Sequence, residues 1–282
     1  MQGRTVWSLT LSSLVIGGVT PRRADSSLPG YEYTCVGGCD TPAGSRAPRG
    51  GVVMAGGSTD VDDGFRWMSA QADGGNFLVL RATGTGAYNQ YIYDMGGVHS
   101  AATIVLREPA AADDDFVTEK IHSAHAIFFA GGNQWNYFGG WSGSRLQAAV
   151  QAAINDRHVP VGGTSAGLAI LGEYVFTAKF GGVTSAEALG DPFVPSVAIA
   201  ERPFLNVPFL SNLITDQHFR ERDRMGRALT FMARISHRRT SGGPTIKAIC
   251  VDERTSLLVD TQTGQATAVS SFGTHPLLPH GT

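Results

Sequence analysis

A serine between two glycines, where a strand-like run meets a helix-like run, constrains this fold most. The stretch from Val159 to Leu168 reads VPVGGTSAGL and contains the pattern G-x-S-x-G at 163–167. Glycines on both sides allow a tight strand-to-helix turn that exposes the serine hydroxyl. The first N–H groups of the following helix would face that hydroxyl and stabilise an oxyanion. Ser165 is therefore a candidate nucleophile and the Ala166 amide a candidate oxyanion donor; the alternative is a small-residue turn that only packs a helix on a strand.

Short apolar runs alternate with helical patterns along the rest of the chain. The early runs are apolar on both faces, which is typical of strands buried in a parallel sheet. This alternation predicts an α/β fold, a doubly wound and mostly parallel sheet between helices, as one domain at residues 49–282. Residues 1–48 are rich in Gly, Pro and Ser and are predicted to be leader and loop. The predicted strands are 51–54, 77–80, 103–106, 126–129, 159–161, 212–214, 248–251 and 256–259, and the predicted helices are 65–71, 143–156 and 222–236.

Composition excludes several classes of function. The 282 residues are 42% hydrophobic and 16% charged, which is ordinary for a soluble globular protein with a large core. A net charge of −2 without clustered Lys and Arg argues against a nucleic-acid partner. The sequence contains no run of 18 apolar residues, so no membrane-spanning helix is predicted. The cysteines and histidines lack the spacing of a zinc site, and the chemistry of a serine nucleophile needs neither a metal nor an organic cofactor, so none is expected.

The N-terminus leaves the cellular location open. Arg4 precedes a semi-apolar run at 6–19, which is typical of a weak signal peptide, although a clear A-x-A cleavage site is missing. A leader of a cytosolic protein is the alternative. Cys35 and Cys39 lie in a Gly-rich segment and could pair if the protein is exported.

A serine nucleophile needs a base and a group that orients the base. His218 follows the apolar run at 212–214, so it is predicted to lie at a strand end near Ser165; a structural histidine is the alternative. Glu187 is the first candidate for the acid. Glu173 would lie two helical turns beyond the serine, and Asp216 would share a strand face with the histidine.

Two further features concern the substrate and the oxyanion. The segment after the histidine, 218–227, is dense in arginine, which suggests an anionic substrate; a charged helix face laced by ion pairs is the alternative. The glycine-rich strand end at 130–134 makes the Gly132 amide a second candidate oxyanion donor. The segments at 56–57 and 84–86 lack the lysine of a phosphate loop, so nucleotide binding is not expected.

Taken in order, the motifs of this chain resemble those of the cyanophycinase and aspartyl dipeptidase family of serine peptidases. The resemblance extends from about residue 51 to residue 259, and the motifs carry it together rather than singly. The segment between Ser165 and His218 is the part where the match is weakest. The motifs are MAGG at 54–57 followed by TDVD at 59–62, FFAGGNQ at 128–134, GTSAG at 163–167, DQHF at 216–219, RDRMGR at 222–227 and VDERT at 251–255.

The resemblance implies a class I glutamine amidotransferase-like fold and a catalytic triad. By position, Ser165 looks like the nucleophile, His218 like the general base and Glu187 like the acid. The residues that look like those shaping an aspartate-binding pocket are Gln134, Asp216, Gln217, Arg222 and Arg227. The chain departs from the pattern at Asn133, where many cyanophycinases have Asp, at Leu168, where the motif often ends in Ala, and in the proline-containing region 190–211.

The expected function is hydrolysis of aspartyl peptide or isopeptide bonds. By resemblance the substrate is cyanophycin, a poly-aspartate with arginine on its side chains, released as β-Asp-Arg dipeptides. A dipeptidase for short Asp-containing peptides is one alternative, and a non-catalytic binder of anionic amino-acid ligands is another. The resemblance also suggests a homodimer.

Overall fold

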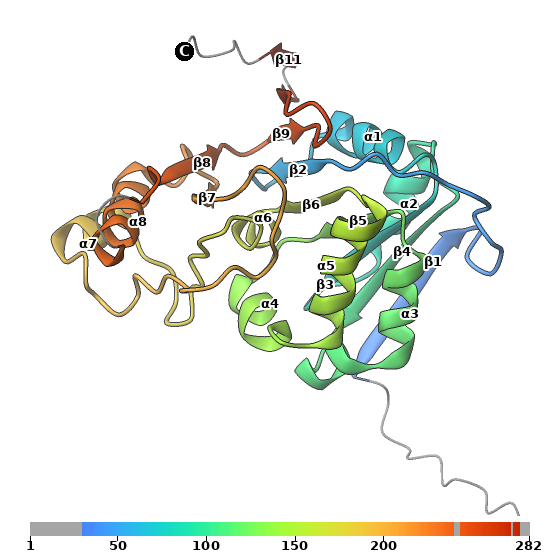
Figure 1. The fold of residues 1–282 in the computed structure, drawn as a ribbon, viewed down its shortest axis with the longest axis horizontal. Coiled ribbons are helices and arrows are strands. Elements are labelled where there is room, and N and C mark those ends of the chain that lie inside the picture. Colours follow the sequence, from blue (N-terminus) through green and yellow to red (C-terminus); the bar gives the residue numbers. More distant parts are fainter. Residues whose placement is uncertain (1–29, 240–242, 272, 277–282) are drawn as a thin grey trace, which may run out of the picture.

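A nine-stranded sheet forms the centre of the described part of the chain, in a computed structural model that describes residues 30–239, 243–271 and 273–276 (Figure 1). Its five central strands are parallel, and the strands at both edges run antiparallel to them. In spatial order the strands are β1 (Tyr31–Gly37), β4 (Ser100–Leu106), β3 (Asn76–Arg81), β5 (Ala126–Phe129), β6 (Val161–Thr164), β2 (Val52–Ala55), β9 (Thr255–Val259), β10 (Ala266–Ser270) and β11 (Gly273–Pro276).

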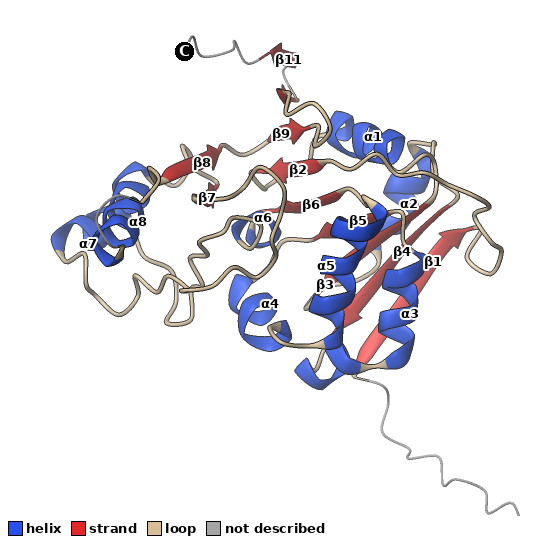
Figure 2. Ribbon diagram, in the orientation of Figure 1, coloured by secondary structure: helices blue, strands red, loops and turns tan. Residues whose placement is uncertain are grey.

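Helices cover both faces of this sheet, so that the fold has three layers (Figure 2). One face packs against α1 (Asp62–Gln71) and α2 (Ala87–Asp94), around Phe65, Phe77 and Phe128. The other face forms the larger core, and its apolar side chains are fully buried, as a doubly covered parallel sheet requires. The elements on that face are the 3₁₀ turn η1 (Pro109–Asp113) and the helices α3 (Asp115–Ser123), α4 (Gln134–Trp141), α5 (Arg145–Arg157) and α6 (Ala166–Ala169).

A smaller unit stands beside the main sheet, at the left of Figure 1. It contains the parallel pair β7 (Leu213–Gln217) and β8 (Lys247–Val251), with α7 (Ser185–Gly190) and α8 (Met225–Arg238) packed together around it. The Thr215 hydroxyl donates to the Leu168 carbonyl at 2.9 Å and so ties β7 to α6. The chain then passes directly from β8 into β9 of the main sheet.

The predicted α/β class is confirmed, and the early apolar runs are neighbouring parallel strands of the main sheet. The predicted helix at 143–156 is α5, and the Ser144 side chain caps it by accepting from the Gln147 N–H. The expectation of loop through residue 48 is wrong for 31–37, because that segment is an edge strand with half-buried and exposed residues in near alternation. The predicted signal-like run at 6–19 lies outside the described residues.

Two further observations concern questions that the sequence leaves open. Cys35 and Cys39 form a disulfide at the end of β1. None of the described helices is both long enough and apolar enough to cross a membrane.

Candidate active site

Ser165 lies on a strained turn between β6 and α6. Its φ of 52° and ψ of −113° are unusual for a residue with a side chain, at a cost of about 1–3 kcal/mol that the surrounding packing must offset. The Ser165 N–H donates to the Ala55 carbonyl at 3.1 Å. A methyl group on Gly163 would lie 2.4 Å from the Gly167 carbonyl, and one on Gly167 would lie 2.0 Å from the Phe129 oxygen. Both glycines are therefore needed for α6 to approach the sheet closely.

Three side chains form a hydrogen-bonded chain that begins at this serine. His218 Nε2 lies 2.8 Å from Ser165 Oγ, and His218 Nδ1 lies 2.6 Å from Glu253 Oε1. His218 directly follows β7, and Glu253 lies in the turn between β8 and β9. Because β7 and β8 are parallel and Gln217 pairs with Val251, the histidine and the glutamate leave neighbouring strand ends at the same edge.

The surroundings of the hydrogen-bonded set Ser165, His218 and Glu253 favour a neutral imidazole next to an ionised carboxylate. Burial lowers the pKa of His218; the hydrogen bond to Glu253 opposes this shift, and the positive charge of Arg222 adds to it. The pKa of Glu253 is lowered, mainly by the hydrogen bond from His218. At neutral pH the imidazole therefore carries its proton on Nδ1 and presents Nε2 to the serine hydroxyl as an acceptor. That arrangement can remove the serine proton during an attack on a carbonyl group.

The expectation that Glu187 orients the histidine is wrong on this geometry. Glu187 is exposed, and its carboxylate accepts from both the N–H and the hydroxyl of Thr184, at 2.8 Å each, in a capping box at the start of α7. The alternative acid Glu173 accepts from the Asn212 N–H instead. The sequence signal for Glu253 was the polar VDERT segment directly after a strand-like run, outside the interval between serine and histidine.

The glycine pair after β2 braces the histidine and the glutamate turn. The Gly56 carbonyl accepts from the His218 N–H at 2.8 Å, and the Gly57 carbonyl accepts from the Arg254 N–H at 3.1 Å. Gly57 has a φ of +104°, and a methyl group there would lie 2.3 Å from Cε1 of the imidazole. This segment thus positions the polar chain by its backbone, and only a residue without a side chain fits against the ring.

The two candidate oxyanion donors belong to segments that adjoin the serine. The Ala166 N–H is the first of α6, and the first N–H groups of a helix have no acceptor within it. Gly131 adjoins the serine, since a methyl group on it would lie 3.5 Å from Ser165 Cβ, and Gly132 follows. Neither Ala166 nor Gly132 donates its N–H to a loop or side-chain acceptor in the described part of the chain. Both donors are therefore free to bind an oxyanion.

Comparison with known proteins agrees with this geometry. The family model for peptidase family S51 matches residues 50–259, which is well over half of the chain. The chain belongs to peptidase family S51. It is 24% identical to the cyanophycinase of Geminocystis herdmanii over 230 residues, which cover 80% of this chain and 68% of that protein. It is 26% identical to the cyanophycinase of Trichormus variabilis over 142 residues, which cover 50% of this chain and 44% of that protein.

A solved structure shares the fold at low sequence identity. A peptidase from an acI-B1 Actinobacterium superposes with a TM-score of 0.55 and 15% identity, covering 83% of this chain and 94% of that one. The two proteins thus share an α/β fold with a mostly parallel central sheet between helices, as the sequence pattern predicted. The chain is a serine-type peptidase of family S51.

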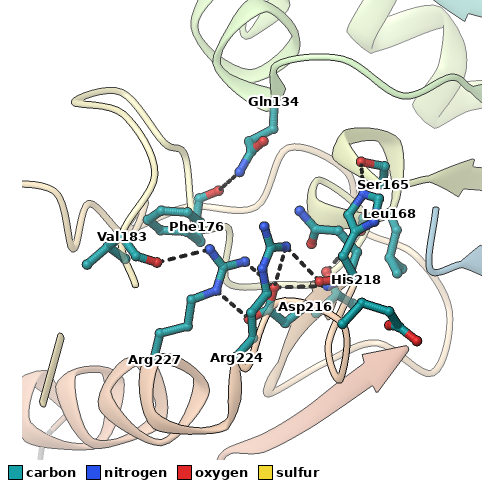
Figure 3. A network of polar contacts seen from close by, with 12 residues as sticks. Gln134, Ser165, Leu168, Phe176, Val183, Asp216, His218, Arg224 and Arg227 are labelled. Carbon is teal, nitrogen blue, oxygen red and sulfur yellow. Dashed lines mark hydrogen bonds and ion pairs between the residues drawn. The ribbon is translucent and has the colours of Figure 1, made fainter. Parts of the chain in front are cut away.

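In this S51 peptidase, two of the residues predicted to shape the pocket bind each other. Arg227 Nε donates to Asp216 Oδ2 at 2.8 Å and Nη2 donates to Oδ1, while Arg224 Nη1 lies 3.4 Å from the same carboxylate (Figure 3). The side chains of Asp216 and Arg227 are each only 3% exposed. The Arg227 guanidinium also lies over the Phe176 ring, 5.1 Å from its centroid. With these groups buried and paired, the network supports the pocket rather than offering free groups to a ligand.

The other predicted pocket residues differ in their access to solvent. Gln134, across the network in Figure 3, is buried and donates from Nε2 to the Phe176 carbonyl at 3.3 Å. Gln217 is buried next to His218. Arg222 is exposed and makes no ion pair with a described residue, yet it is close enough to affect the pKa values of both His218 and Glu253. Arg222 is therefore the cation of this set that an anionic substrate can reach.

Proposed function

We propose that this S51 serine peptidase hydrolyses aspartyl peptide or isopeptide bonds, and that its substrate is cyanophycin, which it degrades to β-Asp-Arg dipeptides. The observation that carries the proposal is the chain of contacts from Ser165 through His218 to Glu253, with the free cation of Arg222 beside it. A cation at the reaction centre favours a substrate that carries a carboxylate there. The curated relatives named above are cyanophycinases, which supports the choice of polymer.

In the proposed reaction, Ser165 Oγ attacks the scissile carbonyl carbon while His218 Nε2 accepts its proton. The Glu253 carboxylate holds Nδ1–H and stabilises the imidazolium that forms. The imidazolium then protonates the leaving amine, and the C–N bond breaks to leave an acyl-enzyme on Ser165. A water molecule, deprotonated by the same imidazole, hydrolyses that ester and restores the free serine.

Backbone amides supply the remaining stabilisation. The N–H groups of Ala166 and Gly132 would bind the negative oxygen of the tetrahedral intermediate. Loss of one such donor typically costs about 3 kcal/mol of transition-state stabilisation. Arg222 would bind the substrate carboxylate, and the buried Asp216–Arg227 pair would hold the floor of the pocket in place.

The test is incubation of the purified protein with cyanophycin, with β-Asp-Arg and with α-aspartyl dipeptides, each beside the Ser165→Ala variant, and identification of the products by mass spectrometry. Release of β-Asp-Arg from the polymer by the wild type alone is the expected result. Cleavage of dipeptides but not of the polymer would replace cyanophycin by short aspartyl peptides. A folded wild type that cleaves none of these would overturn the proposal and favour a binding protein for anionic amino acids.

A further inference from the structure

A cavity opens at the edge of the main sheet that carries Ser165, next to the segment Gly131–Gly132. It has a volume of about 300 Å³, which is at the lower end of the range for ligand pockets. We call it the outer cavity. It lies at the carboxyl ends of β3 and β4 and beside α4, and the residues that line it include Thr83, Arg107, Trp135, Asn136 and Trp141.

The segment Gly131–Gly132 approaches Ser165 at one end and Thr83 of the outer cavity at the other. A methyl group on Gly131 would lie 3.5 Å from Ser165 Cβ, and one on Gly132 would lie 3.6 Å from the Thr83 hydroxyl. Neighbouring residues of an extended peptide lie about 3.3–3.6 Å apart along the chain. A peptide bound with its scissile bond at Ser165 thus reaches the outer cavity within a few residues.

Two arginines fix the loop that forms one wall of this cavity. Arg81 donates from Nε to the Thr83 carbonyl and from Nη1 to the Thr85 carbonyl, the latter at 2.9 Å. Arg107 Nη2 donates to the Gly84 carbonyl, also at 2.9 Å. Three successive carbonyl groups thus point at guanidinium groups, while the Thr83 side chain stays exposed. The segment 83–85 that follows β3 is therefore held in place next to Gly132, which suits a preformed binding surface.

The charges around the outer cavity favour an acidic group. Lys179 Nζ lies 5.3 Å from the centre of the Trp135 ring, which lines the cavity, and it makes no ion pair with any residue in the described ranges. Arg81 likewise has no carboxylate partner among these residues, since its contacts are to carbonyl groups and to the Tyr88 ring. Arg107 is balanced by Glu32 at 3.1 Å. Two cations without a carboxylate partner in the described part of the chain therefore contact residues that line the cavity: Lys179 contacts Trp135, and Arg81 contacts Thr83.

We propose that the outer cavity is a second substrate subsite, which takes a carboxylate-bearing residue within a few positions of the aspartyl residue whose bond is cleaved. The Thr83 hydroxyl donates to that carboxylate, the Trp135 ring contacts the aliphatic part of the residue, and Lys179 supplies the opposite charge. This subsite deepens the proposed function and rests on it. It makes the enzyme select acidic stretches of a peptide or polymer over isolated aspartyl bonds.

The experiment compares two aspartyl peptides that differ only in whether the residues flanking the cleaved aspartyl residue are Asp or Asn. The kcat/KM ratio of the two peptides is measured for the wild type, Thr83→Val and Lys179→Met. Lys120→Met is the matched control, because Lys120 also lies over aromatic rings, those of Tyr33 and Phe116. Lys120 is on α3 and does not line the outer cavity. We expect the wild type and the control to prefer the Asp peptide by about three- to tenfold, and Lys179→Met to lose that preference. General damage to the fold would lower both rates and leave their ratio unchanged.

Binding of the same peptides to Ser165→Ala, measured by calorimetry, separates the subsite from catalysis. Tighter binding of the Asp peptide than of the Asn peptide, if it is lost when Lys179→Met is added, supports the subsite. If the wild type binds in this way but hydrolyses neither peptide, only the proposed function is overturned. Equal kcat/KM and equal affinity for the two peptides, or a preference that survives in Lys179→Met and Thr83→Val, would overturn the subsite.

Discussion

Replacing Glu253 with glutamine tests how the structure assembles its polar chain. Glutamine keeps the size of the side chain but removes the charge that faces His218 Nδ1 at 2.6 Å. A neutral partner no longer stabilises the imidazolium, and the amide can select the wrong imidazole tautomer. The corresponding change in other serine proteases lowers kcat on the order of 10⁴-fold, which is about 5 kcal/mol of transition-state stabilisation. We expect a loss of this size for Glu253→Gln with little change in KM.

The matched control is Glu187→Gln. Glutamine can still complete the capping box at the start of α7, and the exposed carboxylate of Glu187 contacts Thr184 rather than the imidazole, so kcat and stability should both stay at the wild-type level.

Two assays measure the outcome. One is the steady-state hydrolysis of an aspartyl peptide, and the other is the rate at which a fluorophosphonate labels Ser165, which reports on the nucleophile without any assumption about the substrate. Thermal unfolding followed by circular dichroism establishes that each variant is folded. If Glu253→Gln stayed within tenfold of the wild type in both assays, or if Glu187→Gln lost a thousandfold, the reasoning from this geometry would be refuted.

The remaining predictions concern pH, stability and backbone space. Burial lowers the pKa of His218 and the charge of Arg222 adds to this shift, so the acid limb of the kcat/KM profile should lie below the unperturbed value of about 6.5 and move upward in Arg222→Gln; a downward move would contradict this sign. Asp216→Ala leaves the buried Arg227 unpaired and should lower the free energy of unfolding, measured in urea, by about 3–5 kcal/mol. A decrease below about 1 kcal/mol would mean that water reaches the arginine. Gly57→Ala should lower kcat on the order of 100-fold by displacing the imidazole. Unchanged steady-state kinetics would show that the segment around residue 57 moves instead of the imidazole.

The sequence predicted the parts of the site that depend on local geometry. A serine between glycines at a strand end can be recognised because the tight turn itself requires those residues, as the close contacts of Gly163 and Gly167 show. The histidine was found because it also follows a strand. The strands β2, β3, β4 and β5 of the main sheet were found because each contains a short apolar run that is buried on both faces.

The acid was missed because its place depends on which strands are neighbours. Glu253 reaches the histidine only because β8 pairs with β7 in parallel, and no local pattern records that pairing. Glu187 had a purely local role, in a capping box that the T-x-x-E spacing at 184–187 already signals. The edge strand β1 was missed for a related reason, since its residues alternate between half-buried and exposed and were read as loop.

The reacting groups belong to two different sheets. Ser165 follows β6 of the main sheet, whereas His218 follows β7 of the small one, and the Glu253 turn is the covalent link that leads from the small sheet into the main one. The 2.8 Å distance between Ser165 Oγ and His218 Nε2 therefore depends on how closely the two sheets pack against each other. A shift of about 1 Å between them would take this pair beyond hydrogen-bonding distance while every strand stayed intact. Partial separation of the two sheets at low denaturant concentration should thus abolish activity before the main sheet unfolds. Activity would then follow the contact between the two sheets, and circular dichroism would follow the unfolding of the whole fold.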